Sequence, residues 1–464
     1  MDSAHPSNRP RGFGVRAAKW AVAAIMGAAT SAAAADLPAF VGQTVAAQSD
    51  DKNWQAIFNT DLRFTTFNSK RVVPVVPNGN PLAVFRPHGS QFYIPYGLSV
   101  TGTPNPDLKL EFTLRSGYVS SSQTFGPFTG SFSGTTDTVL SATATYYGIT
   151  GIQPFVSVNA NLPTGTPALF GFQRFARLDP DVADISDYGQ GYTVGPSAGA
   201  NIPINDKLVL TLSAGYTYLA PYNTEGFVDP ALEGNQPLGF AAIAFGPTPV
   251  ERLVQVRQAD SVSGSVTLGY TDGPLYATAS ANYLAQVSPL FRDFKVISRR
   301  GDNTSGTAFV SYNFTDEFSA SVVGTITHFE NDFVPGAILP IPLRIQRPNI
   351  NSNVYRLGVD ATYRVTPDLS LGPTASIRYR DRNGFLPTLM QFAPANTRYG
   401  LGGVAQYAVT DALTLKGSVE RIWINTRRIP DQVDASTGLV LPGTGTIALA
   451  SQAWAFAGSL TYRF

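Results

Sequence analysis

Fourteen charged side chains of this sequence lie on one face of segments in which apolar and polar residues alternate. Successive residues of a β-strand point to opposite faces, so charges at every second position line a single side. The basic members of this set are Arg63, Lys109, Arg115, Arg356, Arg364, Arg378, Arg380, Arg382, Arg398 and Lys416. The acidic members on the same faces are Asp61, Glu111, Asp360 and Glu420. An arginine facing lipid costs about 2–4 kcal/mol at the bilayer midplane, so these faces are expected to line water. Because the bases outnumber the acids, such a water-filled space would favour anions.

Sixteen segments of period-two alternation would position these charges. They span 54–67, 90–101, 107–120, 137–148, 151–162, 191–203, 207–219, 260–271, 274–287, 304–314, 318–330, 353–365, 369–383, 397–410, 413–426 and 452–464. Each reaches the ~9–11 residues that a tilted strand needs to cross a bilayer. Short turns and long connections alternate between them, and several short turns resemble YRVTPDLSLG from Tyr363. A soluble propeller would instead need a fixed repeat length. The sequence therefore predicts an all-β fold, an antiparallel transmembrane β-barrel of about sixteen strands with short periplasmic turns and long extracellular loops.

The connection 163–190 carries a second group of charges. Its four acidic residues are Asp179, Asp181, Asp184 and Asp187. In a ring of sixteen strands this connection, between the fifth and sixth, lies half a turn from the arginine-rich thirteenth and fourteenth. Its aromatic residues, such as Phe170 and Phe175, would be buried if the loop folded inward, and the acids would then face a basic wall. The alternative is an exposed surface loop with ordinary surface acids.

Few residues in this chain could catalyse a reaction or bind a metal. Cysteine is absent, which excludes disulfides, thiolate catalysis and cysteine-based metal sites. After residue 35 only His88 and His328 remain, and neither has the spaced partners of a metal site or a catalytic triad. The formal net charge of +1 gives no basic surface for nucleic acid. We therefore expect no enzyme activity, no cofactor, no metal and no nucleic-acid partner.

The N-terminal residues have the pattern of an export signal. Four basic residues precede a short apolar stretch, and small residues follow up to Ala35. We expect a cleaved signal peptide at 1–35, a short periplasmic segment at 36–53 and the barrel at 54–464. A membrane anchor is the alternative, but the apolar stretch is too short for one.

The sixteen alternating segments, with tyrosine and phenylalanine near their ends, resemble a Gram-negative outer-membrane β-barrel of the porin type. The final Tyr462 and Phe464 resemble the C-terminal signal by which the barrel-assembly machinery recognises such barrels. The resemblance implies residence in the cell outer membrane. It implies contacts with outer-membrane lipid and lipopolysaccharide, the assembly machinery and small solutes, and it leaves a homotrimer open.

The expected function is passive diffusion of small hydrophilic solutes through a lumen with a basic wall. One alternative is a substrate-specific uptake barrel, for example for aromatic or hydrophobic compounds. The segment NLPTG at 161–165 is similar to a strand end in barrels associated with uptake of aromatic compounds. A structural or autotransporter-like barrel without an open pore is the other alternative. The space left inside the barrel would discriminate between these functions.

Overall fold

The computed structural model describes residues 54–69, 71–73, 83–126, 128–178, 181–183, 185–228, 250–335, 344–347, 351–384, 393–427, 432–433, 440–441 and 449–464. The expected signal peptide and periplasmic segment, 1–53, lie outside these residues. Within the described part, no helix is long and apolar enough to cross a bilayer.

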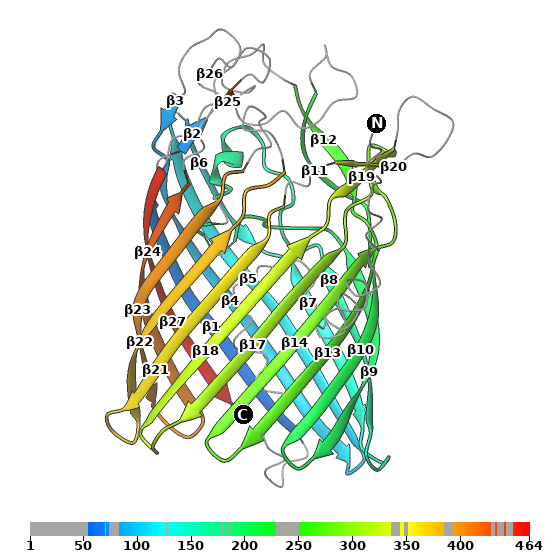
Figure 1. Cartoon of the computed structure of the whole chain (residues 1–464), viewed down its shortest axis with the longest axis vertical. Coiled ribbons are helices and arrows are strands. Elements are labelled where there is room, and N and C mark those ends of the chain that lie inside the picture. Colours follow the sequence, from blue (N-terminus) through cyan, green and yellow to red (C-terminus); the bar gives the residue numbers. More distant parts are fainter. Residues whose placement is uncertain are drawn as a thin grey trace, which may run out of the picture.

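Sixteen antiparallel strands form a closed barrel (Figure 1). They are β1 (Trp54–Asn68), β4 (His88–Asn105), β5 (Leu108–Phe125), β7 (Thr138–Tyr146), β8 (Gln153–Leu162), β9 (Thr193–Asn205), β10 (Leu208–Leu219), β13 (Ser261–Asp272), β14 (Leu275–Gln286), β17 (Asn303–Asn313), β18 (Phe318–Phe329), β21 (Val354–Arg364), β22 (Leu369–Arg380), β23 (Asn396–Ala408), β24 (Leu413–Thr426) and β27 (Leu449–Arg463). Each strand pairs with the next in this order. The predicted fold class and strand number are confirmed.

The ring closes between the first and last strands. β27 runs antiparallel to β1, from the pair Ile57 and Arg463 to the pair Asn68 and Gln452. The backbone N–H of Phe464 continues this ladder by donating to the carbonyl of Ala56 at 2.9 Å. No barrel strand therefore presents an unpaired edge, which a sheet surrounded by hydrocarbon could not tolerate.

Threonine side chains fix several of the short turns. The Thr410 hydroxyl accepts hydrogen bonds from the backbone N–H groups of Ala412 and Leu413, at 3.2 and 3.0 Å. Thr366 accepts in the same way from Leu369 at 3.1 Å. A hydroxyl that satisfies backbone donors lets the chain reverse within a few residues. This explains why the recurring Thr-containing motif marks the tight ends of the strands.

The outer face of the barrel is apolar. Outward positions keep large hydrophobic side chains exposed, as at Leu401 (58%), Tyr363 (55%) and Ile326 (54%). A monomeric soluble protein does not expose apolar surface around its whole circumference. The alternation in each strand thus separates an apolar outside from a polar inside.

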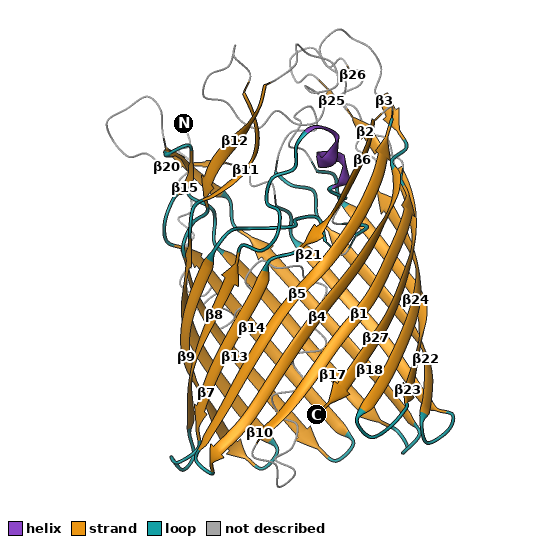
Figure 2. Ribbon diagram, turned by 180° about the vertical axis from the view of Figure 1, so that it is seen from behind, coloured by secondary structure: helices purple, strands orange, loops and turns teal. Residues whose placement is uncertain are grey.

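The long connections carry short strands at the opposite end from the tight turns (Figure 1). These are β2 (Arg71–Val73) with β3 (Ala83–Phe85), β19 (Asp332–Pro335) with β20 (Arg344–Arg347), β25 (Gln432–Val433) with β26 (Val440–Leu441), and a sheet of β11 (Tyr222–Val228), β12 (Val250–Arg257), β15 (Leu290–Arg292) and β16 (Lys295–Ser298). β6 (Phe128–Thr135) extends the β5 hairpin beyond the ring. The 3-10 helix η1 (Gly171–Ala176) belongs to the connection between β8 and β9 and lies at this same end (Figure 2).

Candidate functional site: a loop held across the lumen

The described part of the connection 163–190 crosses the inside of the barrel. It leaves β8 and returns to β9, yet Asp181 binds side chains of β22 and β23, half of the ring away. We call this connection the crossing loop. It contacts both the wall beside its origin and the wall opposite, so it divides the lumen at the loop-bearing end.

Asp181 is the contact with the far wall. Its carboxylate pairs with Arg378 Nη2 at 2.6 Å and with Arg380 Nη2 at 3.0 Å. Asn396 Nδ2 donates a further, short hydrogen bond to Asp181 Oδ2. Asp181 is 8% exposed, and the side chain of Arg378 is 11% exposed. A carboxylate buried this deeply is tolerated because charged and amide donors replace its water.

Apolar packing surrounds this ion cluster. Loop residues on either side of Asp181 join a buried cluster with inward side chains of β1, β24 and β27. Its members are Leu178, Val182 and Ala183 from the loop and Phe67, Ile422, Ile424 and Ala453 from the wall. Ile422 and Ile424 share the inward phase of Glu420, where the sequence pattern suggests only water. Removing these apolar surfaces from water stabilises the docked loop at about 25 cal/mol per Å² buried.

The near wall holds the loop by hydrogen bonds. Gln91 of β4 donates to the carbonyl of Ile185 at 2.7 Å and accepts from its N–H at 3.2 Å. Ser121 of β5 lies 2.9 Å from the carbonyl of Ala176 and 2.7 Å from the Tyr188 hydroxyl. Gln91 is 2% exposed and Tyr188 is completely buried. Burial also raises the pKa of Tyr188, which keeps it a neutral donor to Ala176.

The helix η1 rests on β6 through aromatic rings. Phe175 stacks on Phe128 with ring centroids 5.2 Å apart, and Phe172 lies 6.1 Å from the same ring. Gly130 lies directly beneath, since a Cβ there would come within 2.7 Å of Phe175 Cβ and would also meet the carbonyl of Phe172. The close approach of helix and strand therefore requires glycine at this position.

Arg177 anchors the loop above the barrel. Its Nε donates to Glu225 of β11 at 2.8 Å, and Nη1 donates to Asp187 at 3.0 Å. Burial alone would raise the pKa of Glu225, but the hydrogen bond and charge of Arg177 outweigh burial and lower that pKa. The Leu169 N–H also donates to Glu225, at 3.1 Å. Glu225 is therefore a charged anchor at neutral pH.

Asp137, between β6 and β7, joins the two ends of the loop. One carboxylate oxygen accepts from the N–H of Gly165 at 2.9 Å. The other accepts from the N–H of Gln190 and from Asn161 Nδ2, both at 2.7 Å. Because both loop ends converge on one carboxylate, the loop leaves and re-enters the wall at a fixed point.

Other inward charged side chains of the arginine-rich wall have partners on neighbouring strands. Arg398 pairs with Glu420 at 3.2 Å, and Ser376 donates to the same carboxylate at 2.7 Å. Asp360 accepts from Ser321 at 2.5 Å. The other inward bases of this wall are Arg356 and Arg364 on β21 and Lys416 on β24.

On the other side of the lumen the bases are paired locally. Arg63 binds Asp61 at 2.7 Å, and Lys109 binds Glu111 at 2.9 Å. Arg115 follows in the same inward phase of β5. Inward bases outnumber inward acids on β21 to β23, where the five arginines are Arg356, Arg364, Arg378, Arg380 and Arg398 and the strands themselves carry one inward acid, Asp360.

Two expectations about individual charges differ from the structure. Strand β22 ends at Arg380, so Arg382 lies beyond the inward face on which it was expected. Asp187 is 64% exposed and pairs with Arg177 of its own loop rather than facing the basic wall. Asp179 and Asp184 lie outside the described residues.

Sequence reasoning does not identify Gln91, Asp137 or Glu225. Their roles depend on contacts with residues far along the chain, and no local spacing signals such contacts. In the described residues, no group of three or more histidine, aspartate or glutamate side chains is placed to hold a metal ion.

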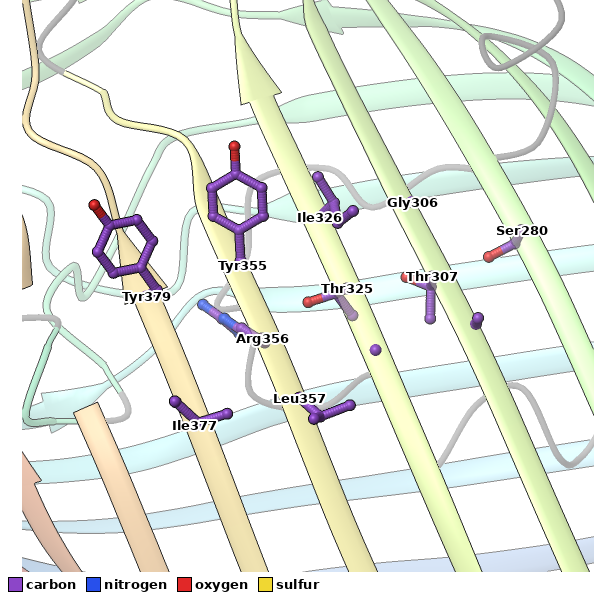
Figure 3. Close-up of a pocket in the computed structure, with 12 residues that line it drawn as sticks. Ser280, Gly306, Thr307, Thr325, Ile326, Tyr355, Arg356, Leu357, Ile377 and Tyr379 are labelled. Atoms are coloured by element: carbon purple, nitrogen blue, oxygen red, sulfur yellow. The ribbon is translucent and has the colours of Figure 1, made fainter. Parts of the chain in front are cut away.

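A depression of about 620 Å³ lies on the barrel wall, over β14 to β22 (Figure 3). Outward residues such as Tyr355, Leu357 and Tyr379 border it. Gly306 and Gly324, which have no side chains, also line it. None of its lining residues belongs to the crossing loop.

No family model matches this chain. No curated protein matches it either. Among solved structures, OmpT, an outer membrane protein of Vibrio cholerae, is 11% identical, with 89% of this chain and 99% of that chain covered and a TM-score of 0.36. A Pseudomonas aeruginosa FadL homologue is 12% identical, with 89% and 90% covered and a TM-score of 0.37. The Ralstonia pickettii toluene transporter TbuX is 10% identical, with 88% and 89% covered and a TM-score of 0.35. These values are too low for a function to be carried over.

Proposed function

We propose that this protein is an outer-membrane uptake channel whose entrance is narrowed by the crossing loop. Passage is then selective, unlike the open diffusion expected from the sequence. The observation that carries the proposal is the docking of Asp181 on Arg378 and Arg380, which holds the loop against the far wall. A sixteen-strand lumen crossed by a loop that is fixed at both walls has less free space than an empty one.

The membrane placement is supported by the surface of the barrel. Apolar side chains cover its outside. Charged side chains in the middle of the barrel strands face inward, except that of Arg421. The end with long loops faces the cell exterior, as in barrels of this architecture. Tyr462 and Phe464 point outward at the opposite end and are 37% and 63% exposed, where the assembly machinery would recognise them. Association into a homotrimer is a further prediction.

The favoured solutes are small, polar and negatively charged. Below the crossing loop, inward positions hold serine, threonine and asparagine, as in the pairs Ser157 with Ser197 and Thr211 with Asn201. Arg356 and Arg364, on inward positions of β21, add positive charge to one wall. A polar lumen with one basic wall lowers the barrier for anions and orients dipolar solutes.

Aromatic compounds are a second candidate class. Phe128, Phe172 and Phe175 form a stacked group on the loop-bearing end, and Phe172 is 63% exposed. An exposed aromatic group can hold a planar apolar solute by stacking. This aromatic group lies at the mouth of the barrel rather than in the lumen, so we rank aromatic solutes second.

Flux into liposomes tests the proposal. The refolded protein would be compared with protein-free liposomes, using acetate, a tetraalkylammonium ion and toluene as the anionic, cationic and aromatic probes. Faster acetate entry supports the first class, and faster toluene entry alone supports the second. Equal entry of all three at the rate of an open pore would contradict selectivity, and no entry above background would contradict a channel.

A further inference from the structure

One arginine breaks the separation of an apolar outside from a polar inside. Arg421 pairs in register with Leu401 of β23 and with Trp454 of β27, which are both exposed outward residues. Away from the strand ends, Arg421 is the one charged side chain in outward phase on the barrel strands that the structure describes. A cation on this face would be costly unless something outside the barrel compensated it.

Among the residues that the structure describes, the neighbours of Arg421 are aromatic rings and an amide. Its guanidinium carbon lies 4.9 Å from the Trp454 ring centre and 5.9 Å from that of Trp423. Arg421 Nη2 donates a short hydrogen bond to Gln452 Oε1. None of the described carboxylates forms a salt bridge with it. Two indole rings and an amide hold the guanidinium in place, and they leave most of its five N–H donors for a partner.

The position of Arg421 along β24 places it near the headgroup region of the outer leaflet. Leu413, eight residues earlier, pairs with Tyr462 near the turn end of the barrel. Eight residues of a strand tilted by about 40° rise roughly 20 Å within an apolar band about 25 Å tall. A long side chain at this level can extend its charged end to the interface. Trp423, two residues further, lies where interfacial tryptophans are expected.

We propose that Arg421, with Gln452 and the two indole rings, binds the phosphate of a phosphorylated lipid in the surrounding outer leaflet. A guanidinium offers two parallel donors that match two phosphate oxygens, and a phosphate supplies the missing negative charge. The flanking rings of Trp423 and Trp454 would pack on the sugar or acyl part of the lipid. This proposal rests on the membrane placement proposed above and not on transport.

Binding in detergent tests it without measuring flux. The refolded protein in dodecyl maltoside would be titrated with bisphosphorylated lipid A and with the same lipid after removal of its phosphates, and bound lipid counted by native mass spectrometry. Arg421→Gln should weaken binding of the phosphorylated lipid by about tenfold or more and leave the dephosphorylated lipid unchanged. Arg421→Lys should lie between them. Inorganic phosphate at equal concentration should not compete, because it lacks the apolar part.

The control variant is Lys207→Gln, which removes a positive charge from an exposed turn pair with Asp272. It should bind lipid A as the original protein does. Equal binding by Arg421→Gln and the original protein would overturn the proposal, and so would competition by inorganic phosphate. Loss of oligomer mass in Arg421→Gln with unchanged lipid binding would assign the residue to a contact between copies instead. In phosphatidylcholine liposomes Arg421→Gln should keep normal solute flux, so a failed lipid site and a failed channel give different results.

Discussion

Replacing Asp181 by asparagine should release the crossing loop while keeping its shape. The substitution removes the charge that pairs with Arg378 and Arg380 and leaves those guanidinium groups close together without an acid. Breaking a buried ion pair by removing one partner costs about 3–5 kcal/mol. The lower end applies here, since the Arg380 side chain is 23% exposed and remains partly hydrated.

A loss of about 3 kcal/mol corresponds to roughly a hundredfold change in the ratio of docked to released loop. Single-channel recording in planar bilayers measures this directly. The Asp181→Asn protein should spend far more time in a high-conductance state, and acetate flux into liposomes should rise.

Asp187→Asn is the matched control, because it makes the same change in the same loop. Asp187 is 64% exposed, and its pair with Arg177 is a surface interaction worth at most about 1 kcal/mol. This variant should differ from the original protein by less than about fivefold. If Asp181→Asn and the original protein show the same conductance and flux, the ion cluster does not control passage and the reasoning fails.

Four further changes test other parts of the account. The folded-state pKa of Glu225 lies below the ordinary 4.5. The pair of Glu225 with Arg177 therefore stabilises the docked loop above pH 4.5, and this stabilisation is lost as the pH falls through the folded-state pKa. Conductance should rise on acidification, and Glu225→Gln should abolish the rise. Arg356→Gln should shift the reversal potential in a salt gradient toward cations, and an unchanged potential would remove its role in ion preference. Gly130→Ala should separate η1 from β6 and raise flux, whereas an unchanged proteolysis pattern and flux would show that the helix adapts. Phe464→Ala should lower the amount of assembled barrel in the membrane more than the thermal stability of barrel already assembled, and normal membrane levels would count against an assembly signal.

The strands could be predicted because residue types within each strand alternate between the apolar outside and the polar inside. In β21 the outward Tyr355, Leu357 and Val359 alternate with inward Arg356 and Asp360, and this alternation is readable without knowing any partner. The ring order follows from the short turns, so the position of 163–190 opposite β22 and β23 could also be anticipated.

The details of the site could not be predicted, since they depend on long-range contacts. Ile422 and Ile424 look like an ordinary break in a polar face until the loop covers them. Gln91 and Glu225 have no local signal for their loop partners. The alternation continues to Arg382 and so predicts a longer strand, whereas β22 ends at Arg380, where Arg380 pairs with Asn396 of β23.

The most direct test of the account fixes the loop reversibly on the far wall. The chain has no cysteine, so Asp181→Cys with Asn396→Cys introduces the sole thiol pair, at two side chains in hydrogen-bond contact. A one-carbon bis-methanethiosulfonate reagent would bridge the two thiols, and a reductant would separate them. Acetate flux should be low in the bridged protein and should rise to the level of Asp181→Asn after reduction. Equal flux before and after reduction would contradict the claim that the crossing loop controls passage.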